Sequence, residues 1–264
     1  MKFMTSKKFK TIKIIAPIYE YGLILINPLI LEKDIKIRRI NYPEEPELIE
    51  ENLKLPSFKY SCITEIRYTF DPRDINEPFP NIGQLLAKIE IALRIFNGGA
   101  IGFAGIISQP KILPFPMVLS RVAPTGENKY KIDKDKLKEF PEFYKKFKIA
   151  YSKKQVAFDW FSKSYFDVPA NKFIDYCICL ENLFVPPNEN RKKSFILQGI
   201  ILLNIDVNKN KIETLIDYRN AIIHADSSKQ HKILKDKIGS TYMFINNYEE
   251  MLRKILQIYI EKQW

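Results

Sequence analysis

The spacing of apolar residues changes along the 264-residue chain, and this change limits the folds open to it. In the first part, short runs alternate apolar with polar side chains or are rich in β-branched and aromatic residues, which is typical of strands. Such runs lie at 11–18, 21–26, 34–40 and 59–70. From about residue 133 the apolar residues recur at helical spacing instead. The pattern predicts an α+β protein, with a mixed β-rich domain over residues 1–132 followed by an all-α bundle over residues 133–264.

One helix is predicted inside the β-rich part. Residues 81–96 carry apolar side chains at helical spacing, and Gly98 and Gly99 follow as a C-terminal stop. Strand-like runs at 100–107 and 116–123 come next. The boundary between the two domains is therefore expected between about residues 130 and 150.

The chain is basic. Lysine and arginine outnumber aspartate and glutamate by 42 to 31, which gives a formal net charge of +11 and a pI near 9.3. This balance favours a polyanionic partner such as a nucleic acid over anionic small molecules. A lysine-rich surface that is merely solvated is the alternative.

Cysteine and histidine usage predicts no metal site and no cofactor. Cys177 and Cys179 lie two positions apart on a predicted helix, so their side chains diverge by roughly 200° and do not share a metal. The chain has only two histidines, His224 and His231, so a centre built from several histidines is not expected.

The chain is expected to be cytoplasmic. Its three cysteines are too few and too poorly spaced for a disulfide framework, which favours a reducing compartment. The apolar run near the start is interrupted by Pro17 and Glu20, well before the roughly 20 residues that a membrane span needs. No membrane association is therefore predicted.

Arg219 stands among apolar residues on a helix predicted over residues 212–224. The apolar members of this stripe are Leu215, Ile216, Ile222 and Ile223. A buried guanidinium without a partner is unfavourable, so an anionic or carbonyl group should face it. Glu181 is flanked at helical spacing by apolar residues on the helix predicted over 169–185, and we expect it to pair with Arg219. In the alternative, Arg219 extends its charged end to solvent.

Asn220 and His224 are four positions apart, so they share one face of the predicted helix. The residues after His224, "ADSS", are typical of the start of a new helix, so the first helix should end near His224. The negative end of the helix dipole would favour a protonated imidazole there, which suits acid–base chemistry. An exposed capping histidine is the alternative. Arg219 lies about 140° from His224 on an ideal helix, so only a long side chain, a frayed last turn or a second subunit would bring the two groups together.

The six residues "RNAIIH" at 219–224 resemble the signature of HEPN domains. The stretches "FIDYCICLENLFVPPNENRKKSFILQGIILLN" and "IDYRNAIIHAD" are similar to the ApeA-like branch of that family, and the resemblance covers roughly residues 150–260. Cys179 stands where the family more often has a small residue. The first 130 residues are only loosely similar to the variable β-rich regions that precede such domains.

The resemblance implies a bundle of four to five helices that forms a homodimer and cleaves RNA without a metal. Arg219, Asn220 and His224 would then be the catalytic residues, with Glu181 in support. Two chains would supply an acid and a base for attack by a ribose 2′-hydroxyl. The implied function is an endoribonuclease of the toxin or antiviral-defence kind. An inactive HEPN scaffold for dimerisation or nucleic-acid binding is the first alternative, and an unrelated helical regulatory protein is the second.

Overall fold

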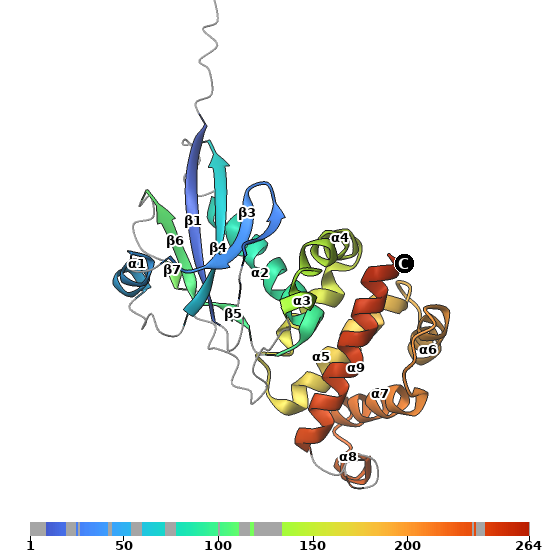
Figure 1. The fold of residues 1–264 in the computed structure, drawn as a ribbon. Helices are drawn as coiled ribbons and strands as arrows, with labels where there is room; N and C mark the ends of the chain where they lie inside the picture. Colours follow the sequence, from blue (N-terminus) through green and yellow to red (C-terminus); the bar gives the residue numbers. More distant parts are fainter. Residues whose placement is uncertain are drawn as a thin grey trace, which may run out of the picture. The chain divides into compact units, whose positions relative to one another are not determined.

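The computed structural model describes most of the chain and has two compact units, unit 1 (Met1–Lys145) and unit 2 (Lys146–Trp264). The described residues are 9–19, 25, 27–41, 44–53, 60–71, 78–99, 101–110, 117–118, 134–233, 235 and 241–263. An antiparallel sheet dominates unit 1 and helices form unit 2 (Figure 1). The predicted α+β class, with the sheet first and the helices second, is confirmed.

The sheet of unit 1 is built around its first described strand. The strands are β1 (Lys10–Tyr19), β2 (Leu29–Glu32), β3 (Ile35–Arg39), β4 (Tyr60–Phe70), β5 (Gly102–Phe103), β6 (Gly105–Gln109) and β7 (Met117–Val118). Their order is β2-β3-β4-β1-β6-β7, with β5 also paired to β1, and all pairings are antiparallel. The β1–β4 ladder runs from the Lys10–Phe70 pair to the Tyr19–Tyr60 pair, with a register shift after Ile18. Because β1 also pairs with β5 and β6 on its other side, it lies inside the sheet.

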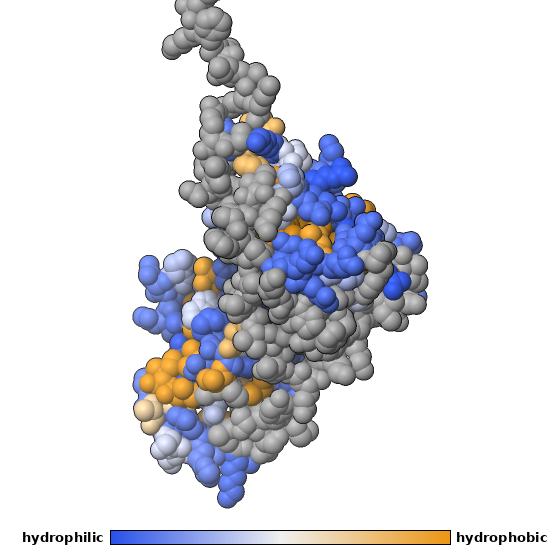
Figure 2. Space-filling view, turned by 90° about the vertical axis from the view of Figure 1, so that its left-hand side faces the viewer, coloured by the Kyte–Doolittle hydropathy of each residue, from blue (hydrophilic) through white to orange (hydrophobic). Residues whose placement is uncertain are grey.

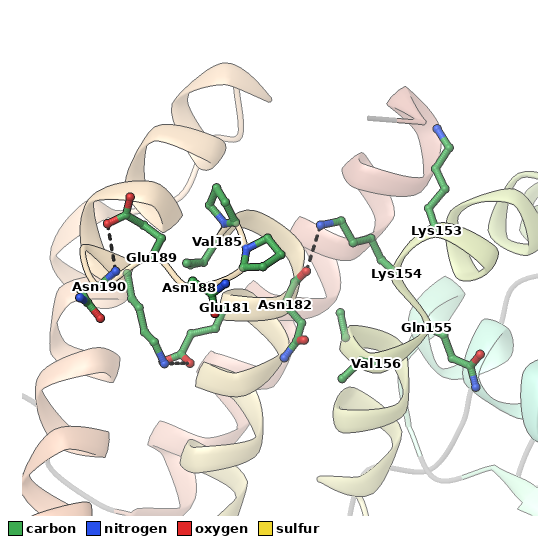
Figure 3. A pocket seen from close by; sticks show the side chains of 14 residues that line it. Lys153, Lys154, Gln155, Val156, Glu181, Asn182, Val185, Asn188, Glu189 and Asn190 are labelled. Atoms are coloured by element: carbon green, nitrogen blue, oxygen red, sulfur yellow. Dashed lines mark hydrogen bonds and ion pairs between the residues drawn. The ribbon is translucent and has the colours of Figure 1, made fainter.

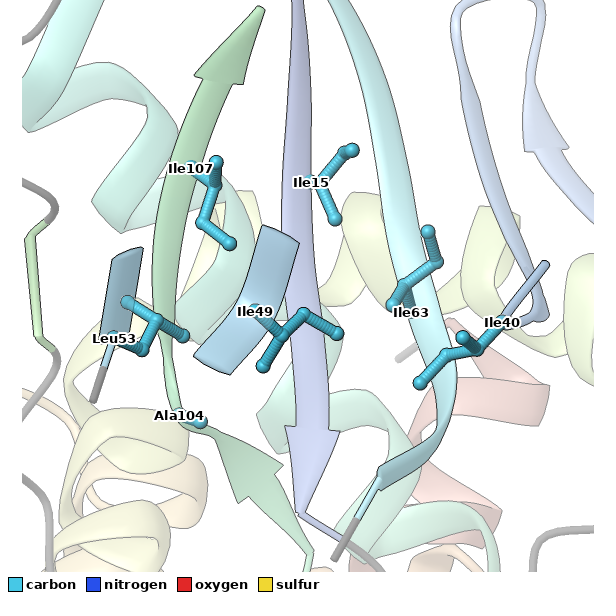
Figure 4. Close-up of a cluster of buried hydrophobic side chains, with 7 residues drawn as sticks. All are labelled: Ile15, Ile40, Ile49, Leu53, Ile63, Ala104 and Ile107. Carbon is cyan, nitrogen blue, oxygen red and sulfur yellow. The ribbon is translucent and has the colours of Figure 1, made fainter. Parts of the chain in front are cut away.

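Two helices of unit 1 cover the sheet. Helix α1 (Glu44–Leu53) places Ile49 and Leu53 against Ile15, Ile63 and Ile107 of the central strands, and all five are buried (Figure 4). Helix α2 (Pro78–Asn97) lies behind the sheet in Figure 1, on the other face. Because side chains alternate across each strand, both faces need apolar residues, and both helices supply them.

Unit 1 also buries a compact ion-pair network. Arg38 donates from Nε to Glu65 (2.8 Å) and from Nη1 to Glu45 (2.9 Å). Lys36 reaches the other oxygen of Glu65 at 2.9 Å. Burial alone would raise the pKa of both glutamates, but Arg38 and its neighbouring cations outweigh it and hold each pKa below its usual value. The negative charges of Glu45 and Glu65 are therefore paired with cations inside unit 1.

Unit 2 is helical. Its elements are the greater part of α4 (Phe140–Lys163), then α5 (Pro169–Phe184), α6 (Lys192–Leu202), α7 (Lys209–Ile223), α8 (Ser227–Ile233) and α9 (Thr241–Lys262). The ring of Phe173 in α5 contacts Tyr218 of α7 and Tyr248 of α9 edge to face, at centroid distances of 5.0 and 6.3 Å. These contacts tie three helices into one core. Among the described residues, no helix has both the length and the apolar character needed to cross a membrane.

The surface in Figure 2 is mostly hydrophilic where it is coloured, with a hydrophobic area in the lower part of the view. In unit 2, Ile201 and Leu202 at the end of α6 are 71% and 68% exposed, and Ile223 at the end of α7 is 49% exposed. Large apolar side chains thus remain in water at two helix ends.

The units divide at Lys145/Lys146, within the interval of about 130–150 expected for the boundary, and Phe140 and Phe143 at the start of α4 pack on Phe96 of α2. Individual elements differ more from the sequence-based expectations. Helix α1 and the short strand β2 were not expected. The predicted strand at 21–26 lies outside the described residues, apart from Leu25, and of the predicted strand at 116–123 only β7 is described.

Candidate functional site

Helix α7 carries the predicted motif, and local interactions fix where it starts. The side chain of Asn208 accepts a hydrogen bond from the backbone N–H of Asn210 (2.9 Å), which caps the first turn. The buried face of α7 is formed by Ile212, Thr214, Leu215, Tyr218 and Ala221. The motif residues Arg219, Asn220 and His224 are therefore presented from the side and the end of a helix that is anchored in the core.

Backbone hydrogen bonds also fix where α7 ends. Ala225 has a left-handed backbone (φ 52°), and its N–H donates to Ile222 O (3.0 Å), while Asp226 N–H donates to Ala221 O (2.9 Å). This is the Schellman arrangement of helix ends. The Asp226 side chain then accepts from Lys229 N–H (2.9 Å) and caps α8. The predicted helix end at His224, followed by a new helix start, is confirmed.

The predicted pairing of Arg219 with Glu181 is present. Arg219 Nη2 lies 3.5 Å from Glu181 Oε1, and Nη1 donates to the Asn220 side-chain oxygen at 3.1 Å. The side chains of Arg219 and Glu181 are 21% and 17% exposed, so the pair lies at the edge of the core. The Nε of Arg219 is buried and makes no hydrogen bond to any residue that the structure describes. One donor of the guanidinium is thus left unsatisfied.

Glu181 is shared between two cations. Its second oxygen, Oε2, accepts a hydrogen bond from Lys192 Nζ at 2.7 Å. One carboxylate therefore faces the guanidinium on one side and an ammonium on the other. The local charge of this group of three is positive, and a further anion would be attracted to it.

The apolar stripe expected around Arg219 is wrong in part. Leu215 is buried, but Ile216 and Ile222 are only half-buried and Ile223 is 49% exposed. The buried face of α7 includes Tyr218 and Ala221, and Ile223 lies outside this face. Arg219 lies at the border of that face rather than within it.

His224 is exposed at the C-terminus of α7. Within the described part of the chain, its imidazole makes no hydrogen bond or ion pair; only its backbone N–H bonds to Asn220 O and Ile222 O. The structure thus brings Arg219, Asn220 and Glu181 together but leaves His224 apart from them in one chain. The catalytic roles assigned to these residues stay predictions.

A groove in unit 2 was not expected from the sequence. We call it the α4–α5 groove; its volume is about 620 Å³. It is lined by Lys153, Lys154, Gln155, Val156, Ala157, Glu181, Asn182, Val185, Pro186, Pro187, Asn188, Glu189, Asn190 and Lys192 (Figure 3). The groove contains Glu181, so it adjoins the Arg219 pair. The run "VPPNEN" after α5 was the one local signal for an irregular wall here.

A second cluster of charged groups lies at the start of α5. Burial raises the pKa of Asp175 to about 6, against the effect of Lys163, whose Nζ lies 2.9 Å from Asp175 Oδ1. Lys163 also reaches Asp167 at 2.7 Å. The charged form of the Asp175 carboxyl group is therefore destabilised by its burial in unit 2.

The cysteines are not placed for chemistry. Cys177 and Cys179 are buried, and burial raises the pKa of both thiols. In the described ranges, no group of three His, Cys, Asp or Glu side chains is arranged to hold a metal ion.

No protein-family model matches the sequence, and neither a curated protein nor a solved structure gives a significant match. The resemblance of residues 219–224 to HEPN domains therefore depends on the motif and its helical setting alone.

Proposed function

We propose that the protein is a metal-independent endoribonuclease of the toxin or antiviral-defence kind, with a HEPN-like site formed across a homodimer. One observation carries the proposal: α7 holds Arg219 and Asn220 in contact and presents an exposed His224 one turn later. The Arg219 side chain is 21% exposed, so its guanidinium could donate hydrogen bonds to a phosphate oxygen.

The chemistry would need two copies of the motif. In-line attack by a ribose 2′-hydroxyl on the adjacent phosphorus requires a base for the hydroxyl proton and an acid for the departing 5′-oxygen. One His224 would accept the first proton, and the protonated His224 of the second copy would donate the other. Arg219 would stabilise the charge on the phosphorane oxygens, and Asn220 would orient either the guanidinium or the imidazole. The products would be a 2′,3′-cyclic phosphate and a 5′-hydroxyl.

Three features of the chain support this proposal. Ile223, which is 49% exposed, stands directly before His224 and offers apolar surface for a second copy. The net charge of +11 favours a polyanion. The three cysteines are buried as free thiols, which suits action in the cytoplasm.

The test is RNA cleavage by the full chain in buffer that contains EDTA. We expect wild type to produce 2′,3′-cyclic phosphate ends, and we expect His224→Ala to lose about 10²–10⁴-fold in rate, because it removes both acid and base. His231→Ala is the matched control, because it removes the other exposed histidine from a neighbouring helix. Equal cleavage by all three proteins would contradict the proposal.

The second candidate is an inactive scaffold that dimerises or binds nucleic acid. It is favoured by one observation: nothing in the described part of the chain orients the His224 imidazole. Binding of RNA by a dimer in which neither wild type nor His224→Ala cleaves would identify the scaffold.

A further inference from the structure

We propose that the α4–α5 groove binds the sugar–phosphate backbone of single-stranded RNA and leads the strand toward Arg219. This inference rests on the proposed nuclease function. The groove would be a second RNA-binding site, in addition to the residues of the motif.

The shape of the groove comes from a break in α4. Lys154 has φ −135° and ψ 39°, outside the helical region, so α4 kinks there. The kinked segment faces the end of α5 and the turn 185–191, where Asn188 has a left-handed backbone (φ 63°). Lys154 Nζ donates to Asn182 O at 3.1 Å and joins the two walls (Figure 3). These contacts give the groove defined walls.

The charged side chains that line the groove, together with the arginines that pair with them, carry a net positive charge. Its lining includes three lysines and two glutamates. Both glutamates are already paired with arginines outside the lining: Glu181 with Arg219 and Glu189 with Arg191. Lys153 is exposed, and its ammonium lies 3.3 Å from the backbone oxygen of Gln263. The three lining lysines and these two arginines outnumber the two glutamates, and this excess of positive charge attracts a phosphate backbone.

Helix α6 begins at one wall of the groove. Asn190 and Lys192 line it, and the N-cap residue Arg191 makes no side-chain capping hydrogen bond. The first-turn N–H groups of a helix have no partner within the helix, and together with the helix dipole they favour a phosphate oxygen. This end of α6 adds to the attraction that the lysines provide.

The groove and the motif share side chains. Glu181 lines the groove through the carboxylate that also pairs with Arg219, and Lys192 bonds to the same carboxylate. A phosphate that draws Lys192 or Arg219 away from Glu181 would occupy the groove end nearest the motif. A strand lying in the groove would therefore bring its next phosphate toward the α7 helix.

The other lining groups favour a single strand over a duplex. A volume of about 620 Å³ is in the range of small-ligand sites, so it accommodates a short stretch of strand and not the width of a duplex. Gln155, Asn182, Asn188 and Asn190 offer amides, which can bond to base edges that are free only in an unpaired strand. Val156, which is 52% exposed, provides apolar surface for a base beside them.

The test uses the full chain and an RNA that it does not cut. The probe is a fluorescent single-stranded RNA of about ten nucleotides, 2′-O-methylated throughout so that no hydroxyl is free to attack. We compare wild type with Lys153→Glu/Val156→Glu, which reverses one charge and adds another inside the groove. The matched control, Ile149→Glu/Lys209→Glu, makes the same changes of charge at exposed positions outside the groove. Circular dichroism and the melting temperature verify that all three proteins fold.

We expect the groove variant to bind at least about tenfold more weakly than wild type at low salt, and the control to lose no more than about twofold. Equal losses in the two variants, or no RNA binding by wild type, would overturn the groove proposal. Cleavage of unmodified RNA separates this outcome from failure of the nuclease proposal. If wild type never cleaves but the groove variant alone loses binding, the groove stands and the nuclease does not. If both variants cleave with the KM of wild type, the nuclease stands and the groove does not.

Discussion

Arg38 in unit 1 and Arg219 in unit 2 both lie beside glutamates, but they differ in how fully they are satisfied. Arg38 is 8% exposed and uses its Nε and both Nη atoms in hydrogen bonds to Glu45 and Glu65. The Arg219 side chain is 21% exposed and pairs with Glu181 at 3.5 Å, and among the described residues its buried Nε has no hydrogen-bond partner. Arg38 is enclosed by its own fold, whereas the more exposed guanidinium of Arg219 is within reach of a ligand.

The same contrast extends to the response to pH. The pKa values of Glu45 and Glu65 are lowered in the folded protein, so their contribution to stability is present above about pH 4.5 and is lost as the pH falls further. The pKa of Asp175 is raised from 3.8 to about 6, so its effect has the opposite sign. Between those two values, the free energy of unfolding of unit 2 decreases as the pH rises. In unit 1 the neighbouring cations outweigh the effect of burial on the pKa values of the two glutamates, whereas in unit 2 burial outweighs the effect of Lys163 on the pKa of Asp175.

The largest effect is expected for Arg38→Ala. The substitution leaves two glutamates buried with fewer cations, and we expect it to lower the free energy of unfolding of unit 1 by about 3–5 kcal/mol. Urea denaturation, with hydrogen exchange of β4 amides to assign the change to unit 1, measures it. The neighbouring exposed residue provides the control, Arg39→Ala, which should change stability by less than about 0.5 kcal/mol. Similar losses of stability in Arg38→Ala and Arg39→Ala would contradict a special role for the buried Arg38 network.

Asp175→Asn should have the next largest effect, with the opposite sign. Asparagine keeps an acceptor for Lys163 and removes the buried charge, so the free energy of unfolding at about pH 7 should rise by about 1–3 kcal/mol. The gain should shrink toward about pH 4, where wild-type Asp175 is protonated in the folded state. Denaturation at both pH values measures it. Asp167→Asn is the control without a gain, because the Lys163 hydrogen bond lowers the pKa of Asp167. A pH-independent gain in Asp175→Asn would contradict this account.

The smallest effect is expected for Glu181→Gln. Losing the charge that faces Arg219 and Lys192 should lower the free energy of unfolding of unit 2 by about 1 kcal/mol, because the pair is partly hydrated. Denaturation of the protein measures it, with Glu213→Gln as the control, since Glu213 forms a longer ion pair of 3.7 Å with Lys193. A loss as large as that of Arg38→Ala would show that the Arg219 pair is as structural as the Arg38 network.

Much of the sheet and the motif helix could be predicted because the signals are local. The β-branched run 59–70 became β4, and the helical spacing of Arg219 within α7 and Glu181 within α5 led to their pairing. Helix α1 was missed although Pro46 and three glutamates stand in its first turn, a combination typical of helix starts. The sequence thus contained a signal for the start of α1, but the strand-like patterns on both sides of this segment led to the prediction of a β-rich region without this helix.

The groove could not be predicted, because its walls come from segments that are distant in the sequence. It depends on the kink at Lys154, on the left-handed Asn188 and on the packing of α4 beside the end of α5. None of these has a periodic pattern in the sequence. The exposure of Ile223 was missed for a related reason, since the helical spacing of apolar residues does not show which part of a helix its neighbours cover.

The central position of β1 in the sheet has a consequence during synthesis. The strand ends at Tyr19, but its partners β4 and β6 begin at Tyr60 and Gly105. At translation rates of about 5–20 residues per second, several seconds pass before the last of these partners leaves the ribosome. Until then the isoleucines of β1 lack part of their native cover, so the sheet of unit 1 is completed only after β6 has been synthesised.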